Sequence, residues 1–308
     1  MGGGQAYHTP TDRAAPEEIL APTCVGPRKR AILSWMNEPE TSPGPLSSRS
    51  IAPGLVAAAI AIAVYAATLS HRFAYDDSEL LHSPLLSHPW DLRGVFTGGF
   101  YAHSERVYGL YQPLGQWCLL LNAAVAKGLT GGYAAPAVYH AVNVLLHATA
   151  SFLLFTWLAS LSIPRRVAGA AAILWAVLPV HAEVAANIAS RTESQALVFG
   201  LGFLIAHRHR RGFLAAALLL AALWSKESSI AFLPLALLGA ALFPQEGGRL
   251  GVRSLLPFGA VLALWLFLRA VAISGEEYAT PYVENPVASA SFGIRWMTAA
   301  GVQLLYLR

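Results

Sequence analysis

The 308-residue sequence is poor in charged residues and in cysteine. Charged residues make up only 12% of the chain, whereas soluble globular domains carry about 25%. Together with 55% hydrophobic residues and a mean hydropathy of +0.49, this scarcity excludes an ordinary soluble domain and predicts a polytopic membrane protein. The two cysteines, Cys24 and Cys118, lie far apart, which excludes a disulfide framework and a cysteine-based zinc pattern. The sequence also lacks a glycine-rich phosphate loop, which argues against a nucleotide-sugar donor.

The net charge of +4 does not indicate a nucleic-acid-binding protein. The basic residues fall in short clusters between apolar runs, and such clusters are typical of membrane topology. Residues 1–49 are rich in Gly, Pro, Ser and Thr and show no hydrophobic periodicity, so we expect a disordered cytoplasmic tail. We expect residues 50–308 to form a transmembrane domain.

About eight apolar runs follow the tail. A helix needs about 20 apolar residues to cross a bilayer, and several of these runs are shorter because polar residues interrupt one end. The sequence therefore predicts an all-α transmembrane helix bundle with about eight spans, the last of them cut off. The runs are Ile51–Leu69, Val138–Leu158, Val167–Val180, Ala196–Ala206, Phe213–Trp224, Ile230–Phe243, Leu255–Ile273 and one that starts near Met297.

Three basic loops predict the orientation of these helices. If residues 164–166, 207–211 and 249–253 lie in the cytoplasm, the helices alternate without conflict and most acidic residues fall outside. The apolar segment 112–129 must then not cross the membrane, because a crossing would move all three loops outside. We expect it to be an interfacial helix within a first outer loop of about 71–137.

Polar residues at the outer helix ends predict a water-filled crater, because charges at membrane depth are costly unless they face a cavity or one another. The crater residues are His181, Glu183, Arg191, Glu193, Lys226 and Glu227, with Asp76 and Asp77 in the loop that would cover them. Simple alternatives are a solvated loop start, helix caps and interface anchors. His140, Asn143 and His147 share one helix face by their spacing, and we expect interhelical hydrogen bonds from them rather than metal binding.

Several motifs between residues 60 and 308 occur in an order that resembles the N-terminal half of GT-C membrane glycosyltransferases. The nearest subgroup is the protein O-mannosyltransferase-like family with transmembrane and tetratricopeptide repeats (TPR), including its bacterial relatives. The chain departs from the family at Gln112, where an arginine of "YRPL" is usual, and at Leu178, where the first histidine of "HPVH" is usual. The matching stretches are "FAYDDSELLHSPLL", "LYQPLGQWCLLLN", "VYHAVNVLLHA", "WAVLPVHAEVAANIASRTESQAL", "WSKESSIAFLPL" and "ENPVASASFGIRWMTAAGVQLLYL".

The resemblance implies transfer of a mannose-like sugar from a polyprenyl-phosphate donor to an acceptor hydroxyl, as in protein O-glycosylation. It implies that Asp76 is the catalytic base, since a carboxylate can accept the proton of the attacking hydroxyl. Asp77 would complete the catalytic pair, and together with Glu183 and His181 it would hold a divalent cation such as Mg²⁺ or Mn²⁺. It also implies a TPR domain beyond this chain.

Arg191 and Lys226 are the predicted ligands of the donor phosphate, because cations stabilise the negative charge that grows on the leaving group. The residues predicted to support the site are Glu193, Glu227, His140, Asn143 and His147.

The expected partners are the lipid bilayer, the polyprenyl-phosphate sugar and a protein or glycan acceptor, with no nucleic acid. The expected location is a bacterial cytoplasmic membrane with the site outside, and the alternative is an endoplasmic reticulum membrane with the site in the lumen. Two other functions stay open. One is a transporter or flippase for lipid-linked sugars, and the other is an inactive membrane anchor for a repeat domain.

Overall fold

The computed structural model describes residues 48–74, 76–77, 83–98, 109–243, 256–274 and 286–306. All regular secondary structure in these ranges is helical, which confirms the predicted all-α class. The described helices belong to one compact unit, Gly44–Arg308. The predicted loop 249–253 and nearly all of the predicted tail 1–49 lie outside the described residues.

Each predicted apolar run contains a helix. The first run forms α2 and the short 3-10 helix η1, and the third forms α7 with its continuation in η3 (Pro179–His181) and α8 (Ala182–Ala186). The run Ile230–Phe243 contains the end of the 3-10 helix η4 (Glu227–Ala231) and α11, and the other runs form one helix each. The main helices are α2 (Ser48–Tyr65), η1 (Ala66–Ser70), α6 (Pro136–Ser160), α7 (Arg165–Ala176), α9 (Arg191–Arg208), α10 (Gly212–Ser225), α11 (Phe232–Leu242), α12 (Leu256–Ala272) and α13 (Phe292–Tyr306).

The number of spans differs from the prediction. Within the described ranges, two helical segments are long and apolar enough to cross a membrane, Ile51–Ser70 and Pro136–Ser160. A third is added if the helix pair Arg165–Ala176 and Pro179–Ala186, bent by 54°, counts as one span. Helices α10 and α12 and the segment Glu227–Leu242 are apolar but shorter. The expected eight or so spans are therefore not confirmed, because polar residues and proline shorten the apolar helices at one end.

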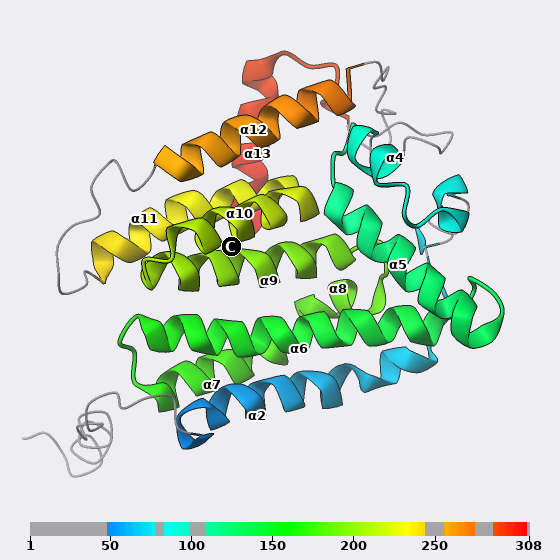
Figure 1. Cartoon of the computed structure of the whole chain (residues 1–308). Coiled ribbons are helices and arrows are strands. Elements are labelled where there is room, and N and C mark those ends of the chain that lie inside the picture. Colours follow the sequence, from blue (N-terminus) through cyan, green and yellow to red (C-terminus); the bar gives the residue numbers. More distant parts are fainter. Residues whose placement is uncertain are drawn as a thin grey trace, which may run out of the picture. The chain divides into compact units, whose positions relative to one another are not determined.

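The helices pack side by side in a fixed order. Helix α2 contacts α6 and α7, α9 lies between α6 and α10, and α10 contacts α12 (Figure 1). The largest buried cluster includes Phe203 of α9 and Leu219 and Leu223 of α10. Gly200 lets α9 approach α11, since a Cβ atom at this position would overlap the ring of Phe232.

The two ends of this bundle are built differently. At one end Arg208 donates hydrogen bonds to the carbonyl oxygens of Ser160 and Phe243, and so joins the ends of α6, α9 and α11. We call this the basic end, because the loops 164–166 and 207–211 lie there (Figure 1). We call the opposite end, where α9 begins and α10 finishes, the polar end.

A segment between α2 and α6 covers the polar end. Its described helices are η2 (Pro84–Ser87), α4 (Leu92–Thr97) and α5 (Pro113–Thr130). Figure 1 shows α5 running obliquely across the ends of α6, α9 and α10, all of which it contacts. The helix predicted over 112–129 is confirmed, and its position at a membrane interface stays a prediction.

Candidate active site

Asp77 anchors the covering segment to the polar end. Its side chain is 1% exposed. One carboxylate oxygen accepts hydrogen bonds from the backbone N–H groups of Ile188 (2.8 Å) and Ala189 (3.1 Å), and the other accepts one from Ala74 (3.0 Å). Both carboxylate oxygens of Asp77 therefore accept hydrogen bonds from the backbone. One donor lies three residues before Asp77, and the others lie more than a hundred residues after it. This pairing satisfies buried N–H groups in the connection between α8 and α9.

Arg191 holds the start of α9 against α6. Its side chain is 0% exposed, Nε donates to Oδ1 of Asn143 (2.7 Å), and Nη2 donates to the carbonyl oxygen of Tyr139 (2.7 Å). Asn143 in turn donates to the carbonyl oxygen of Asn187 (2.9 Å). Two nitrogens of the guanidinium thus bond to α6, while Nη1 is buried without a hydrogen-bond partner among the described residues. The role of Arg191 as a ligand of the donor phosphate stays a prediction.

The polar residues of α6 make interhelical contacts, as predicted for two of the three. Asn143 bonds to the α8–α9 connection, and Nε2 of His147 lies 3.0 Å from the carbonyl oxygen of Ala176 on α7. His140 is fully buried, and its ring meets that of His71 in an edge-to-face contact, with centroids 6.2 Å apart. These residues shape the protein around the site.

Asp76 is exposed, in contrast to its neighbour Asp77. It lines a cavity of about 700 Å³ at the polar end, together with Glu183, Asn187, Arg72 and His71. We call this the Asp76 cavity; Ala74 and Ala186 complete its lining. Two carboxylates and a guanidinium thus face one space that a ligand can enter.

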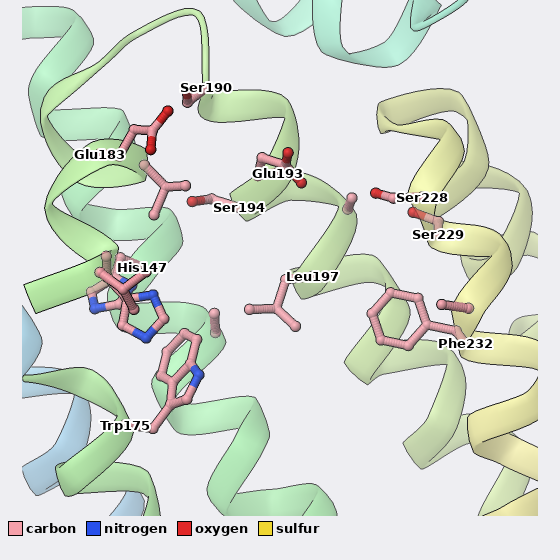
Figure 2. A pocket seen from close by; sticks show the side chains of 16 residues that line it. His147, Trp175, Glu183, Ser190, Glu193, Ser194, Leu197, Ser228, Ser229 and Phe232 are labelled. Carbon is pink, nitrogen blue, oxygen red and sulfur yellow. The ribbon is translucent and has the colours of Figure 1, made fainter. Parts of the chain in front are cut away.

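A second cavity of about 490 Å³ lies between α8, α9 and α11, and we call it the amphipathic cavity. Glu183 lines both cavities. Figure 2 shows Trp175, Leu197 and Phe232 on its apolar side, and Glu193 with Glu183 on its polar side. Serine hydroxyls add to the polar side, from Ser190, Ser194, Ser228 and Ser229. Such a lining suits a ligand with a polar head and an apolar chain.

Lys226 and Glu227 point in different directions from the end of α10. The ammonium group of Lys226 pairs with Glu193 at 2.8 Å. The carboxylate of Glu227 accepts hydrogen bonds from the backbone N–H of Tyr111 (2.9 Å) and from Nε2 of Gln112 (2.9 Å). Glu227 therefore fixes the start of α5. Gln112, one of the two departures from the family motif, has a structural partner here.

The predicted cation site does not assemble. Within the described part of the chain, no group of three or more His, Cys, Asp or Glu side chains is placed to hold a metal ion. The oxygens of Asp77 accept backbone hydrogen bonds, and the ring of His181 packs against Trp175 with centroids 4.2 Å apart. Glu183 is the member of the predicted trio that lines the Asp76 cavity.

Arg72 and His71 are basic residues of the Asp76 cavity that were not predicted from the sequence. They come directly before the motif "FAYDD", and this closeness to Asp76 in the sequence is the feature that could have indicated them. The basic residues predicted from the sequence lie at helix ends, and one of them, Arg191, is buried.

The fold and the site define an all-helical protein with membrane-type helices and with carboxylates facing cavities at one end. Curated relatives make the class more specific. The chain is 29% identical over 199 residues to "Protein O-mannosyl-transferase F38B6.6" of Caenorhabditis elegans, covering 62% of this chain and 28% of that protein. It is 29% identical over 283 residues to "Protein O-mannosyl-transferase Tmtc1" of Drosophila melanogaster, covering 82% and 32%. With "Protein O-mannosyl-transferase TMTC2" of Mus musculus it shares 34% over 169 residues, covering 52% and 19%.

These similarities are consistent with a TMTC-like protein, as the motifs of the chain predicted. It spans about a third or less of the length of these relatives. No protein-family model matches the chain, and no solved structure matches it.

Proposed function

We propose that this chain provides the catalytic region of a membrane glycosyltransferase. The enzyme moves a mannose-like sugar from a polyprenyl-phosphate donor to a hydroxyl group of a protein. The names of the relatives support sugar transfer to protein. The observation that carries the proposal is the exposed carboxylate of Asp76 in a polar cavity, beside a buried Asp77 that fixes the backbone around it.

The chemistry assigns Asp76 the role of general base. A hydroxyl group is a poor nucleophile, and a carboxylate within hydrogen-bond reach accepts its proton as the new bond to the sugar C1 forms. The bond between C1 and the donor phosphate oxygen breaks at the same time. The electron pair of that bond leaves with the lipid phosphate, and the sugar configuration inverts.

The amphipathic cavity is the proposed binding place of the lipid-linked donor. Its apolar side fits an isoprenoid chain, and its polar side fits sugar hydroxyls, which carboxylates and serines can bind. Lys226 lies at the polar end beside this cavity and remains the predicted phosphate ligand that is partly exposed. If a divalent cation takes part, Glu183 is the carboxylate available for it, because Asp77 is occupied.

The basic loops support an orientation of the site in the membrane. Basic loops favour the cytoplasm, so we place the basic end inside and the polar end outside. The enzyme would then act on the outer face of a bacterial cytoplasmic membrane, or on the lumenal face of the endoplasmic reticulum.

The test is transfer of mannose from polyprenyl-phosphate mannose to an acceptor peptide by the full-length protein in proteoliposomes. Asp76→Asn keeps the shape of the side chain but removes proton acceptance, so the rate should fall about 10²- to 10⁴-fold. Asp91→Asn is the matched control, because Asp91 is exposed on the same segment and asparagine also caps a helix well. Wild-type activity in Asp76→Asn would remove this residue from the mechanism. Movement of intact donor across the bilayer without transfer would instead indicate a flippase.

A further inference from the structure

The proposed reaction needs a cation at the donor phosphate, and both cations predicted from the sequence already have protein partners. Arg191 is 0% exposed and bonded to Asn143 and Tyr139. Lys226 already forms an ion pair with Glu193. A phosphate would have to compete with that carboxylate for the ammonium group. The structure thus directs attention to other basic side chains at the polar end.

Arg72 is exposed and lines the Asp76 cavity. The backbone on both sides of it is fixed. The N–H of His71 donates to Thr68 (2.9 Å), the ring of Phe73 packs on Tyr139 with centroids 5.5 Å apart, and the N–H of Ala74 donates to Asp77 (3.0 Å). Successive side chains of an extended segment point to opposite sides. Phe73 packs against α6, so its neighbour Arg72 faces the other way, toward the cavity.

The charges of the cavity make this arginine necessary for an anionic ligand. Asp76 and Glu183 line the same space and repel a phosphate. Arg72 offsets that repulsion with a permanent positive charge. Its guanidinium also presents parallel N–H donors whose spacing matches two phosphate oxygens, which an ammonium group cannot offer. His71 lies in the same lining and can donate a further hydrogen bond.

We propose that Arg72 binds the phosphate of the lipid-linked donor, with His71 as a second hydrogen-bond donor. This inference rests on the proposed glycosyltransferase function and names the residue that holds its leaving group. It places the phosphate in the cavity that holds Asp76, so the base and the leaving group share one space. Arg191 then supports the walls of that space.

The test separates phosphate recognition from transfer. Binding of polyprenyl phosphate, of polyprenol without phosphate and of inorganic phosphate is measured by calorimetry with the full-length protein in nanodiscs. Arg72→Gln should weaken the binding of polyprenyl phosphate about 10- to 100-fold, which is the usual range for the loss of a hydrogen bond to a charged group. The same variant should leave the binding of polyprenol unchanged. Arg72→Lys should restore part of the loss. Arg93→Gln is the matched control, because Arg93 is exposed on α4 and lines neither cavity.

Each other outcome decides the matter. Unchanged binding of polyprenyl phosphate by Arg72→Gln overturns the inference, and so does an equal loss of polyprenol binding, because the phosphate would then not be what Arg72 recognises. Inorganic phosphate that binds as tightly as the lipid and depends equally on Arg72 would assign the site to free phosphate and overturn the donor assignment. If the lipid phosphate depends on Arg72 but the wild-type protein transfers no sugar, the inference stands and the proposed function fails.

Discussion

The basic end and the polar end of the helix bundle differ in the side chains that form hydrogen bonds at the helix termini. At the basic end an arginine, Arg208, donates to terminal carbonyl groups of two neighbouring helices. At the polar end, the buried side chain of Asp77 bonds to backbone N–H groups, and those of Asn143 and Arg191 bond to backbone and to each other. Burying polar groups costs free energy unless they are hydrogen-bonded. At the polar end these hydrogen bonds offset the cost of burial. They also hold the backbone in place around the cavities that Asp76 and Glu183 line.

The largest effect should come from removing the central anchor of the polar end. Asp77→Ala leaves three backbone N–H groups without their acceptor. The bond from Ile188 is buried and the other two are partly buried, and an unsatisfied buried group costs about 1–3 kcal/mol. We expect a loss of about 3–5 kcal/mol in the free energy of unfolding, measured by denaturant titration in detergent. Asp76→Ala is the neighbouring control and should change stability by less than about 0.5 kcal/mol, because the side chain is exposed. Equal stability of the two variants would contradict the division of roles between the aspartates.

A smaller loss should follow when α5 is released from the polar end. Glu227→Ala removes the acceptor of the Tyr111 N–H and of the Gln112 amide, which should cost about 1–3 kcal/mol. Hydrogen exchange at the first turn of α5 should rise with it. Ser228→Ala, at the adjacent and exposed position, is the control and should leave this exchange unchanged. Unchanged protection in Glu227→Ala would mean that packing, and not this carboxylate, holds the helix in place.

The basic end should tolerate the loss of its arginine better. Arg208→Gln weakens contacts with helix C-terminal carbonyl groups, for which a cation is worth about 0.3–1 kcal/mol. Arg210→Gln serves as the control, because Arg210 is exposed in the same basic cluster. The apparent melting temperature of the two variants in nanodiscs gives the comparison. A loss of stability in Arg208→Gln as large as that in Asp77→Ala would show that the hydrogen bonds at the two ends contribute equally to stability.

Hydrophobic runs and spacing were enough to predict the helices and part of the frame. The apolar runs all contain helices, and the shared helix face of Asn143 and His147 correctly predicted their interhelical bonds. These features repeat with the helical period, so they are visible in a single sequence. The short apolar helices α10 and α11, by contrast, show that apolar composition did not fix the number of spans.

The roles of adjacent residues were beyond the sequence. Asp76 and Asp77 are chemically identical, and only contacts with the distant residues Ile188 and Ala189 bury one of them. Arg191 was expected at the surface of the crater, but its partners on α6 draw it inside. Arg72 was overlooked for the same reason, since its place in the cavity depends on where Phe73 packs. Tertiary contacts, which have no local signature, decide each of these.

The smallest effect is expected at the ion pair of the polar end. Lys226 and Glu193 are 2.8 Å apart, but their side chains are 30% and 45% exposed, so water and salt screen them. A double-mutant cycle with Lys226→Met and Glu193→Gln should give a coupling of about 0.2–1 kcal/mol that shrinks as salt rises. The same cycle measured on donor binding sharpens the contrast with the buried anchors. If Glu193 competes with the donor phosphate for Lys226, Glu193→Gln alone should bind polyprenyl phosphate more tightly and lose that gain in the double variant. Weaker binding of polyprenyl-phosphate mannose, but not of polyprenyl phosphate, by Glu193→Gln would instead mean that this carboxylate contacts the sugar hydroxyls of the donor.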